Sequence, residues 1–237
     1  MNKSDQIISG FIIKSQDLGE ADLLLTFFSE TEGKLRAVVK SAKKMISKLS
    51  GNLQPYILVQ VTLVGDGGLQ KVIGVQSIAR YVNIISSMHG MNALLAMQEL
   101  VLRSLADGQP NEQLFAIYHA SLQSLNAGLP EVAVLTQFYI ESLQAIGFAP
   151  RIAQTEAKFF SIKDGQFSNT YHDSGDVSVT SEVYQLYEKM LSRSFNISED
   201  YSASLEPTFI ELLTLLTRFA SYQLERELKA TLYFTIA

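Results

Sequence analysis

The hydrophobic period of the sequence changes near residue 80, and this change restricts the possible folds more than any other feature. Before it, "YILVQVTLV" (56–64) carries apolar residues at alternate positions, which is the spacing of a half-buried strand. After it, apolar residues such as Leu135, Phe138 and Tyr139 recur every three or four positions, as in an amphipathic helix. We therefore expect a β domain over residues 1–80 and a helical domain over residues 81–237.

Five short strands are expected in the N-terminal domain. They are apolar segments bounded by turn residues, at 6–14, 21–29, 34–40, 56–64 and 69–78. Five strands with a longer connection between the third and the fourth favour a small closed barrel, and the OB-fold is the commonest barrel of this kind. The expected fold class is a multidomain chain with an all-β five-stranded OB-fold barrel followed by an α-helical domain.

The helical domain is interrupted by one segment without helical spacing. Helices are expected at 91–106, 112–126, 131–146, 181–193 and from Pro207 onward. Between them, residues 151–180 contain "FFSIKDGQFSN", which is typical of a hairpin that turns at Asp164 and Gly165. We expect this hairpin to be inserted in the helical domain.

The composition excludes several classes of function. The chain has no cysteine, so disulfides, thiolate nucleophiles and cysteine-ligated metals are excluded. It has no GxSxG motif, and its three histidines match no catalytic or metal spacing. It also lacks a secretory signal and a run of eighteen apolar residues. We expect a cytoplasmic protein without a membrane partner, without a cofactor and without enzymatic activity.

Positive charge is concentrated in one stretch of an acidic chain. Residues 1–80 hold ten Lys or Arg against seven Asp or Glu, whereas residues 81–237 hold nine against seventeen. The strand "KLRAVVK" (34–40) places cations on one face at a spacing of roughly 6.6 Å, close to that of phosphates along a single strand. We predict DNA contacts at Lys34, Arg36, Lys40, Lys43, Lys44 and Lys48, with Tyr56 as an exposed aromatic for base stacking. The alternative is a solvated run of charge.

Three segments resemble the RecO family of bacterial recombination mediators. The long one is "KSQDLGEADLLLTFFSETEGKLRAVVKSAKKMISKLSGNLQP" (14–55), and the short ones are "LQAIGFAP" (143–150) and "YQLERELKATLYF" (222–234). The resemblance implies an N-terminal oligonucleotide-binding barrel, a helical C-terminal domain and a nucleoid-associated DNA-repair protein without an active site.

The resemblance also implies particular partners. Such proteins bind single- and double-stranded DNA and the C-terminal tail of single-stranded-DNA-binding protein. They anneal complementary strands coated with that protein and, with RecR, help to load RecA. An alternative is a protein–protein adaptor of the repair machinery with little intrinsic DNA binding. A hydrolase or nuclease is a weaker alternative, because no spaced cluster of acids or histidines is present.

Many members of the family carry two CxxC pairs in a zinc module after the turn that "GFAP" resembles. The corresponding positions here are Thr155, Lys158, Ser168 and Tyr171, and none of them can supply a thiolate. We therefore expect a degenerate module without zinc, in which Phe159, Phe160 and Phe167 hold the hairpin together.

Overall fold

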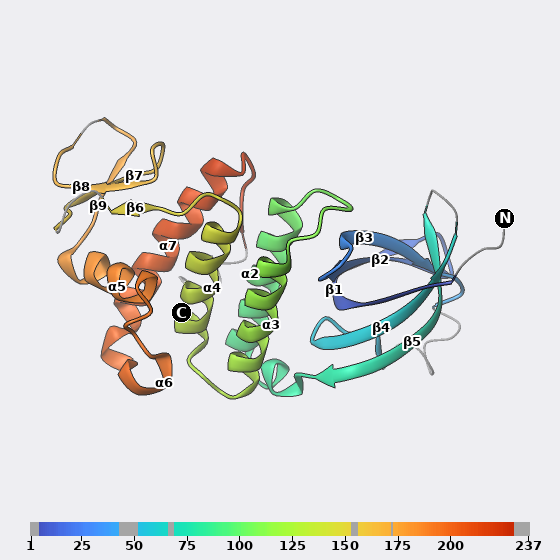
Figure 1. The fold of residues 1–237 in the computed structure, drawn as a ribbon. Helices are drawn as coiled ribbons and strands as arrows, with labels where there is room; N and C mark the ends of the chain where they lie inside the picture. The colour runs from blue at the N-terminus through green and yellow to red at the C-terminus, as the bar shows by residue number, and fades with distance from the viewer. Residues whose placement is uncertain (1–4, 43–51, 66–68, 153–155, 172, 230–237) are drawn as a thin grey trace. The chain divides into compact units, whose positions relative to one another are not determined.

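The computed structural model describes residues 5–42, 52–65, 69–152, 156–171 and 173–229 (Figure 1). The chain divides into two compact units. The first comprises Met1–Val82 and Ser104–Ala116, and the second comprises Asn83–Arg103 and Ile117–Ala237. Ser104–Ala116 connects the helix that ends at Ser104 to the helix that begins at Glu112 and includes the first turn of the latter. This segment therefore belongs with the N-terminal unit.

A closed five-stranded barrel forms the first unit, which confirms the OB-fold expectation. Its strands are β1 (Gln6–Leu18), β2 (Asp22–Ser29), β3 (Gly33–Val39), β4 (Ile57–Val64) and β5 (Gln70–Arg80). The order around the barrel is β1-β2-β3-β5-β4. The β3–β5 pair is parallel, with Ala37 opposite Gln70 and Val38 opposite Lys71, and the other neighbours are antiparallel.

Alternate residues of these strands fill the barrel with aliphatic side chains. Ile57, Val59, Val61 and Leu63 of β4 are fully buried there, because successive strand residues point to opposite faces. Phe27 joins this core, whereas Phe11 and Phe28 pack on the outside. The ring of Phe115 lies 5.8 Å from that of Phe11 and 5.3 Å from that of Phe28, so the segment 104–116 covers part of the outer face of β1 and β2.

Helices account for most of the second unit. They are η2 (Val82–Ser86), α2 (Met88–Ser104), α3 (Glu112–Asn126), α4 (Glu131–Ala145), α5 (Ser181–Leu191), α6 (Ile197–Asp200), η3 (Ala203–Leu205) and α7 (Glu206–Gln223). The five expected helices are thus confirmed, with ends shifted by a few residues. Thr180 caps α5 by accepting a hydrogen bond from Val183 N–H, and Pro207 lies in the first turn of α7. No helix among the described residues is long and apolar enough to cross a membrane.

A small four-stranded sheet lies between α4 and α5 in the sequence. Its strands are β6 (Arg151–Ile152), β7 (Phe159–Ser161), β8 (Gln166–Ser168) and β9 (Asp176–Ser178), in the order β6-β8-β7-β9. The antiparallel β7–β8 pair confirms the predicted hairpin, and Gly165 has the positive φ of 62° that this turn requires. The rings of Phe160 and Phe167 are fully buried and lie 4.6 Å apart. The hairpin is therefore held by an aromatic core.

Candidate nucleic-acid interface

The outer face of the barrel displays the first cations of the basic stretch. In the β2–β3 pair, Lys34 lies opposite Phe28 and Arg36 lies opposite Thr26. The intervening Leu35 and Ala37 pack into the barrel core, so Lys34 and Arg36 point outward, as the alternation predicts. Lys40 lies one residue beyond the end of β3 and is exposed.

An acidic residue from a distant part of the sequence contacts two of these cations. One carboxylate oxygen of Asp107 lies 3.3 Å from Lys34 Nζ, and the other lies 3.1 Å from an Arg36 nitrogen. Gly108 N–H also donates a hydrogen bond of 2.7 Å to the carbonyl of Lys34. The side chain of Lys34 is only 13% exposed, whereas that of Arg36 is 56% exposed. Arg36 is therefore the more accessible cation.

Gly33 lets the connection between α2 and α3 approach this strand. Its φ is +65°, and a Cβ atom at this position would lie 2.0 Å from the carbonyl oxygen of Gln109. Only glycine accommodates both the backbone conformation and the close contact. The glycine at the start of β3 thus determines how Asp107 reaches Lys34 and Arg36.

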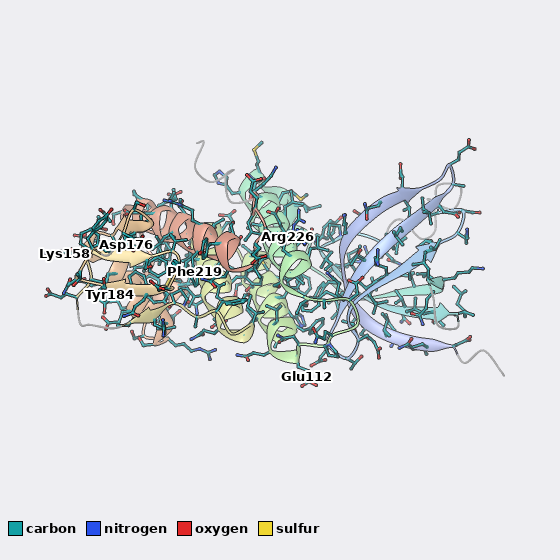
Figure 2. The ribbon with its side chains drawn as sticks, turned by 90° about the horizontal axis from the view of Figure 1, so that it is seen from above. Glu112, Lys158, Asp176, Tyr184, Phe219 and Arg226 are labelled. Carbon is teal, nitrogen blue, oxygen red and sulfur yellow. The ribbon has the colours of Figure 1, made fainter. Side chains whose placement is uncertain are left out.

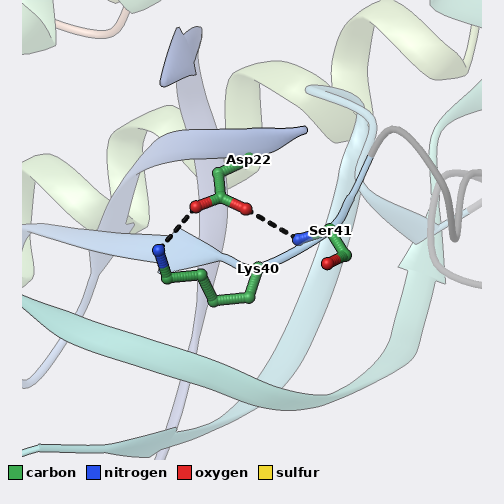
Figure 3. Close-up of polar contacts among 3 residues, drawn as sticks. All are labelled: Asp22, Lys40 and Ser41. Carbon is green, nitrogen blue, oxygen red and sulfur yellow. Dashed lines mark hydrogen bonds and ion pairs between the residues drawn. The ribbon is translucent and has the colours of Figure 1, made fainter. Parts of the chain in front are cut away.

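Lys40 is held by a second acid at the other end of β3 (Figure 3). Its Nζ lies 2.6 Å from Oδ2 of Asp22, and Ser41 N–H donates to Oδ1 of the same carboxylate at 2.8 Å. The hydrogen bond from Lys40 is the main reason why the pKa of Asp22 lies below its usual value, and the hydrogen bond from Ser41 lowers it further. All three described cations of the predicted site therefore have a carboxylate partner.

Two further lysines join this face through the sheet register, and the sequence analysis missed both. Lys14 lies opposite Thr26, which in turn lies opposite Arg36, so the two cations share a row across β1, β2 and β3. Lys71 lies opposite Val38 across the parallel β3–β5 contact. Both lysines are exposed, and within the described ranges neither has an acid at ion-pair distance. The parallel closure of an OB-fold barrel is the signal that could have located Lys71.

The remaining predicted contacts divide into two groups. Lys43, Lys44 and Lys48 lie outside the described residues. Tyr56 is described, and the expectation that it stands exposed is wrong. It precedes β4, is partly buried and packs against the core of the barrel. An aromatic in this position offers little free ring surface for stacking.

The positions that correspond to zinc ligands in the RecO family, which the sequence resembles, do not fit a zinc ion. Lys158 N–H donates to the carbonyl of Ser168, Ser168 Oγ donates to the carbonyl of Thr170, and the Tyr171 ring packs against Phe159 at 5.6 Å. Figure 2 shows where Lys158 lies in the small sheet. These groups offer no thiolate or imidazole, and Thr155 lies outside the described residues. Within the described ranges, no three His, Cys, Asp or Glu side chains gather as a metal site would require.

Comparison with known proteins assigns both units to one family. The family model described as "Recombination protein O N terminal" matches residues 3–81, and the model "Recombination protein O C terminal" matches residues 86–232. An Exiguobacterium protein named DNA repair protein RecO is 27% identical over 204 residues, which cover 81% of this chain and 82% of that protein.

Two other relatives carry the same name. The Desulforamulus reducens protein is 25% identical over 243 residues, with 94% of this chain and 91% of that protein covered. A Synechococcus protein is 26% identical over 157 residues, with 61% and 55% covered. The family models span nearly the whole chain, and the protein therefore belongs to the RecO family.

Proposed function

We propose that this protein is a recombination mediator in DNA repair and that it holds DNA on the outer face of its barrel. Membership of the RecO family and the DNA-repair names of the relatives support the general role. The observation that carries the site is the cross-strand placement of Lys14, Arg36 and Lys71 on one face of a closed barrel.

The mechanism follows from what these side chains can contact. Lysine and arginine neutralise phosphates without reading bases, so a strand held on this face keeps its bases available for pairing. This favours annealing of complementary strands that arrive coated with single-stranded-DNA-binding protein. The acidic tail of that protein, RecR and, indirectly, RecA are the proposed partners. The mechanism includes no covalent step.

Asp107 and Asp22 set a condition on this binding. A DNA phosphate must replace the carboxylates that now contact Lys34, Arg36 and Lys40. The Arg36–Asp107 pair is exposed on both sides, and exposed pairs contribute only about 0–1 kcal/mol, so the exchange at Arg36 has a modest cost. Lys34 is largely shielded, so its exchange is harder. Lys43, Lys44 and Lys48 belong to the proposed site on the ground of sequence, and Tyr56, being partly buried, offers little surface for stacking.

The test is fluorescence anisotropy of a labelled single-stranded oligonucleotide titrated with the full chain over a series of salt concentrations. We expect a log–log slope of about −3 to −4, because each of about five phosphate contacts adds roughly −0.7. The double variant Arg36→Gln/Lys71→Gln should make the slope shallower by about 1.4. The control Lys163→Gln/Lys189→Gln removes the same charge from exposed positions of the helical unit and should leave the slope unchanged. Equal effects of the two double variants would reject the barrel face as the site.

An adaptor with little intrinsic DNA binding is the second candidate function. The ion pairs of Lys34, Arg36 and Lys40 with Asp107 and Asp22 favour it, since they reduce the charge available to phosphates. The two functions differ in the titration at the lowest salt concentration. A mediator binds there, and Lys43→Glu/Lys44→Glu abolishes annealing while the fold survives. An adaptor shows no binding, even when Asp107→Asn releases two cations.

A further inference from the structure

An apolar groove lies in the helical unit beside the small sheet. Its volume is about 720 Å³, and its wall is built from β9 with the residue after it, from α5 and from α7. The apolar residues that line it are Val177, Val179, Val183, Ala203 of η3, Pro207, Ile210 and Leu215. Cavities of this size and apolar lining are typical of binding sites.

The strand at the rim of the groove is an edge strand. Among the described residues, β9 pairs only with β7, at the end of the sheet order β6-β8-β7-β9. Val179 N–H donates to the carbonyl of Lys158 at 2.8 Å. Since successive strand residues alternate in direction, the N–H and C=O of Ser178 point away from β7. Ser178 itself lines the groove, so an unpaired strand edge borders an apolar wall.

The charges around the groove discriminate between possible occupants. Glu206, Glu211 and Arg218 of α7 line it, and all three side chains are exposed. Two carboxylates against one guanidinium make this rim acidic. A segment with Lys or Arg beside its apolar residues is complementary to the rim, whereas an acidic segment meets like charge.

We propose that this groove binds an extended peptide segment with basic flanks. The segment adds a strand to β9 through the backbone of Ser178, as in other cases of β-augmentation. It places an apolar side chain between Val179 and Ile210, and a Lys or Arg beside Glu206 and Glu211. This site is separate from the barrel face, and its chemistry excludes the acidic tail of single-stranded-DNA-binding protein as the preferred occupant.

The probe is a labelled peptide, acetyl-Lys-Val-Ile-Val-Lys-amide, and the matched control is acetyl-Glu-Val-Ile-Val-Glu-amide. Both are titrated against the full chain and followed by fluorescence anisotropy. We expect the basic peptide to bind about tenfold more tightly, because two charge pairs change sign between the peptides. Glu206→Gln/Glu211→Gln should remove most of this preference. Equal affinities, or tighter binding of the acidic peptide, would overturn the proposal.

A backbone variant tests the edge strand separately. Ser178→Pro removes the N–H that faces away from β7, and proline is tolerated on an edge strand in that orientation. Ser178→Pro should lower the affinity for the basic peptide by a factor of about ten or more. Ser178→Ala, which keeps the N–H, should leave this affinity unchanged. If Ser178→Pro does not fold, Thr214→Arg fills the groove from an exposed position of α7 and should abolish binding. Unchanged binding in the folded variant would contradict strand addition.

Discussion

The barrel and the small sheet are both β structures, but the barrel has the longer strands and only the barrel closes. Each strand of the barrel, as described, has two neighbours, and its interior is mostly aliphatic, with Phe27 as the fully buried aromatic residue of its core. The small sheet stays open, and its buried face is aromatic, with Phe160 and Phe167 packed against Phe219 and Tyr187. Closure satisfies the backbone, so the barrel can present only side chains to a partner, whereas the open sheet also presents its backbone. This contrast is the reason why we expect a polyanion to bind the barrel and a peptide to bind the small sheet.

The largest expected effect concerns the aromatic core of the open sheet. Phe160 is fully buried, with its ring 4.6 Å from that of Phe167 and 5.4 Å from that of Phe219. Phe160→Ala should lower the free energy of unfolding by about 3–5 kcal/mol, since it leaves a cavity. Urea denaturation followed by circular dichroism measures this loss. Its neighbour Phe159 is only partly buried, so Phe159→Ala should cost clearly less, and equal losses would show that the sheet does not depend on this core.

A smaller loss is expected where the barrel meets its covering segment. Gly33→Ala should destabilise the fold by roughly 2–3 kcal/mol, because the positive φ and the contact with Gln109 both oppose a Cβ atom. Gly19 is a matched control, since its φ is +67° but no atom lies within 4 Å of the corresponding Cβ. Gly19→Ala should cost about 1–2 kcal/mol. If the two variants unfold at the same urea concentration, the close contact at Gly33 contributes nothing.

A change at Asp107 sharpens the comparison on the DNA side. Asp107→Asn removes the carboxylate shared by Lys34 and Arg36. If the barrel acts through its side chains, affinity for single-stranded DNA should rise about three- to tenfold at low salt. Glu188→Gln changes the net charge equally at an exposed position of α5 and should have little effect. A similar gain in both variants would point to overall charge rather than to this face.

The smallest effect is a pH dependence at Asp22. The hydrogen bonds from Lys40 and Ser41 lower its pKa in the folded protein, so the ionised carboxylate favours folding. This contribution is present above the ordinary pKa near 4 and is lost as the pH falls through the folded-state pKa. Asp22→Asn should therefore be less stable than the parent at pH 7, and the difference should shrink towards pH 3. Thermal unfolding at both pH values tests this, and a constant difference would contradict it.

The sequence alone determined the features that depend on neighbouring residues. The alternation in "YILVQVTLV" specifies β4, the three-four spacing of Leu135, Phe138 and Tyr139 specifies α4, and Asp164-Gly165 specifies the hairpin turn. Each of these patterns is a period or a turn preference within one element. The individual strands, the helices and the hairpin were therefore predictable, as was the outward direction of Lys34 and Arg36.

The tertiary structure decided which distant residues meet. Asp107 lies more than seventy positions from Lys34 and contacts it only because Gly33 admits the α2–α3 connection. Lys14 and Lys71 join the face of Arg36 through cross-strand register, and Tyr56 packs on the barrel core. Such contacts depend on how strands pair and how the chain closes, and no local period encodes that pairing. The sequence alone showed the positive charge of the basic stretch, but only the tertiary structure showed that Asp107 and Asp22 pair with it.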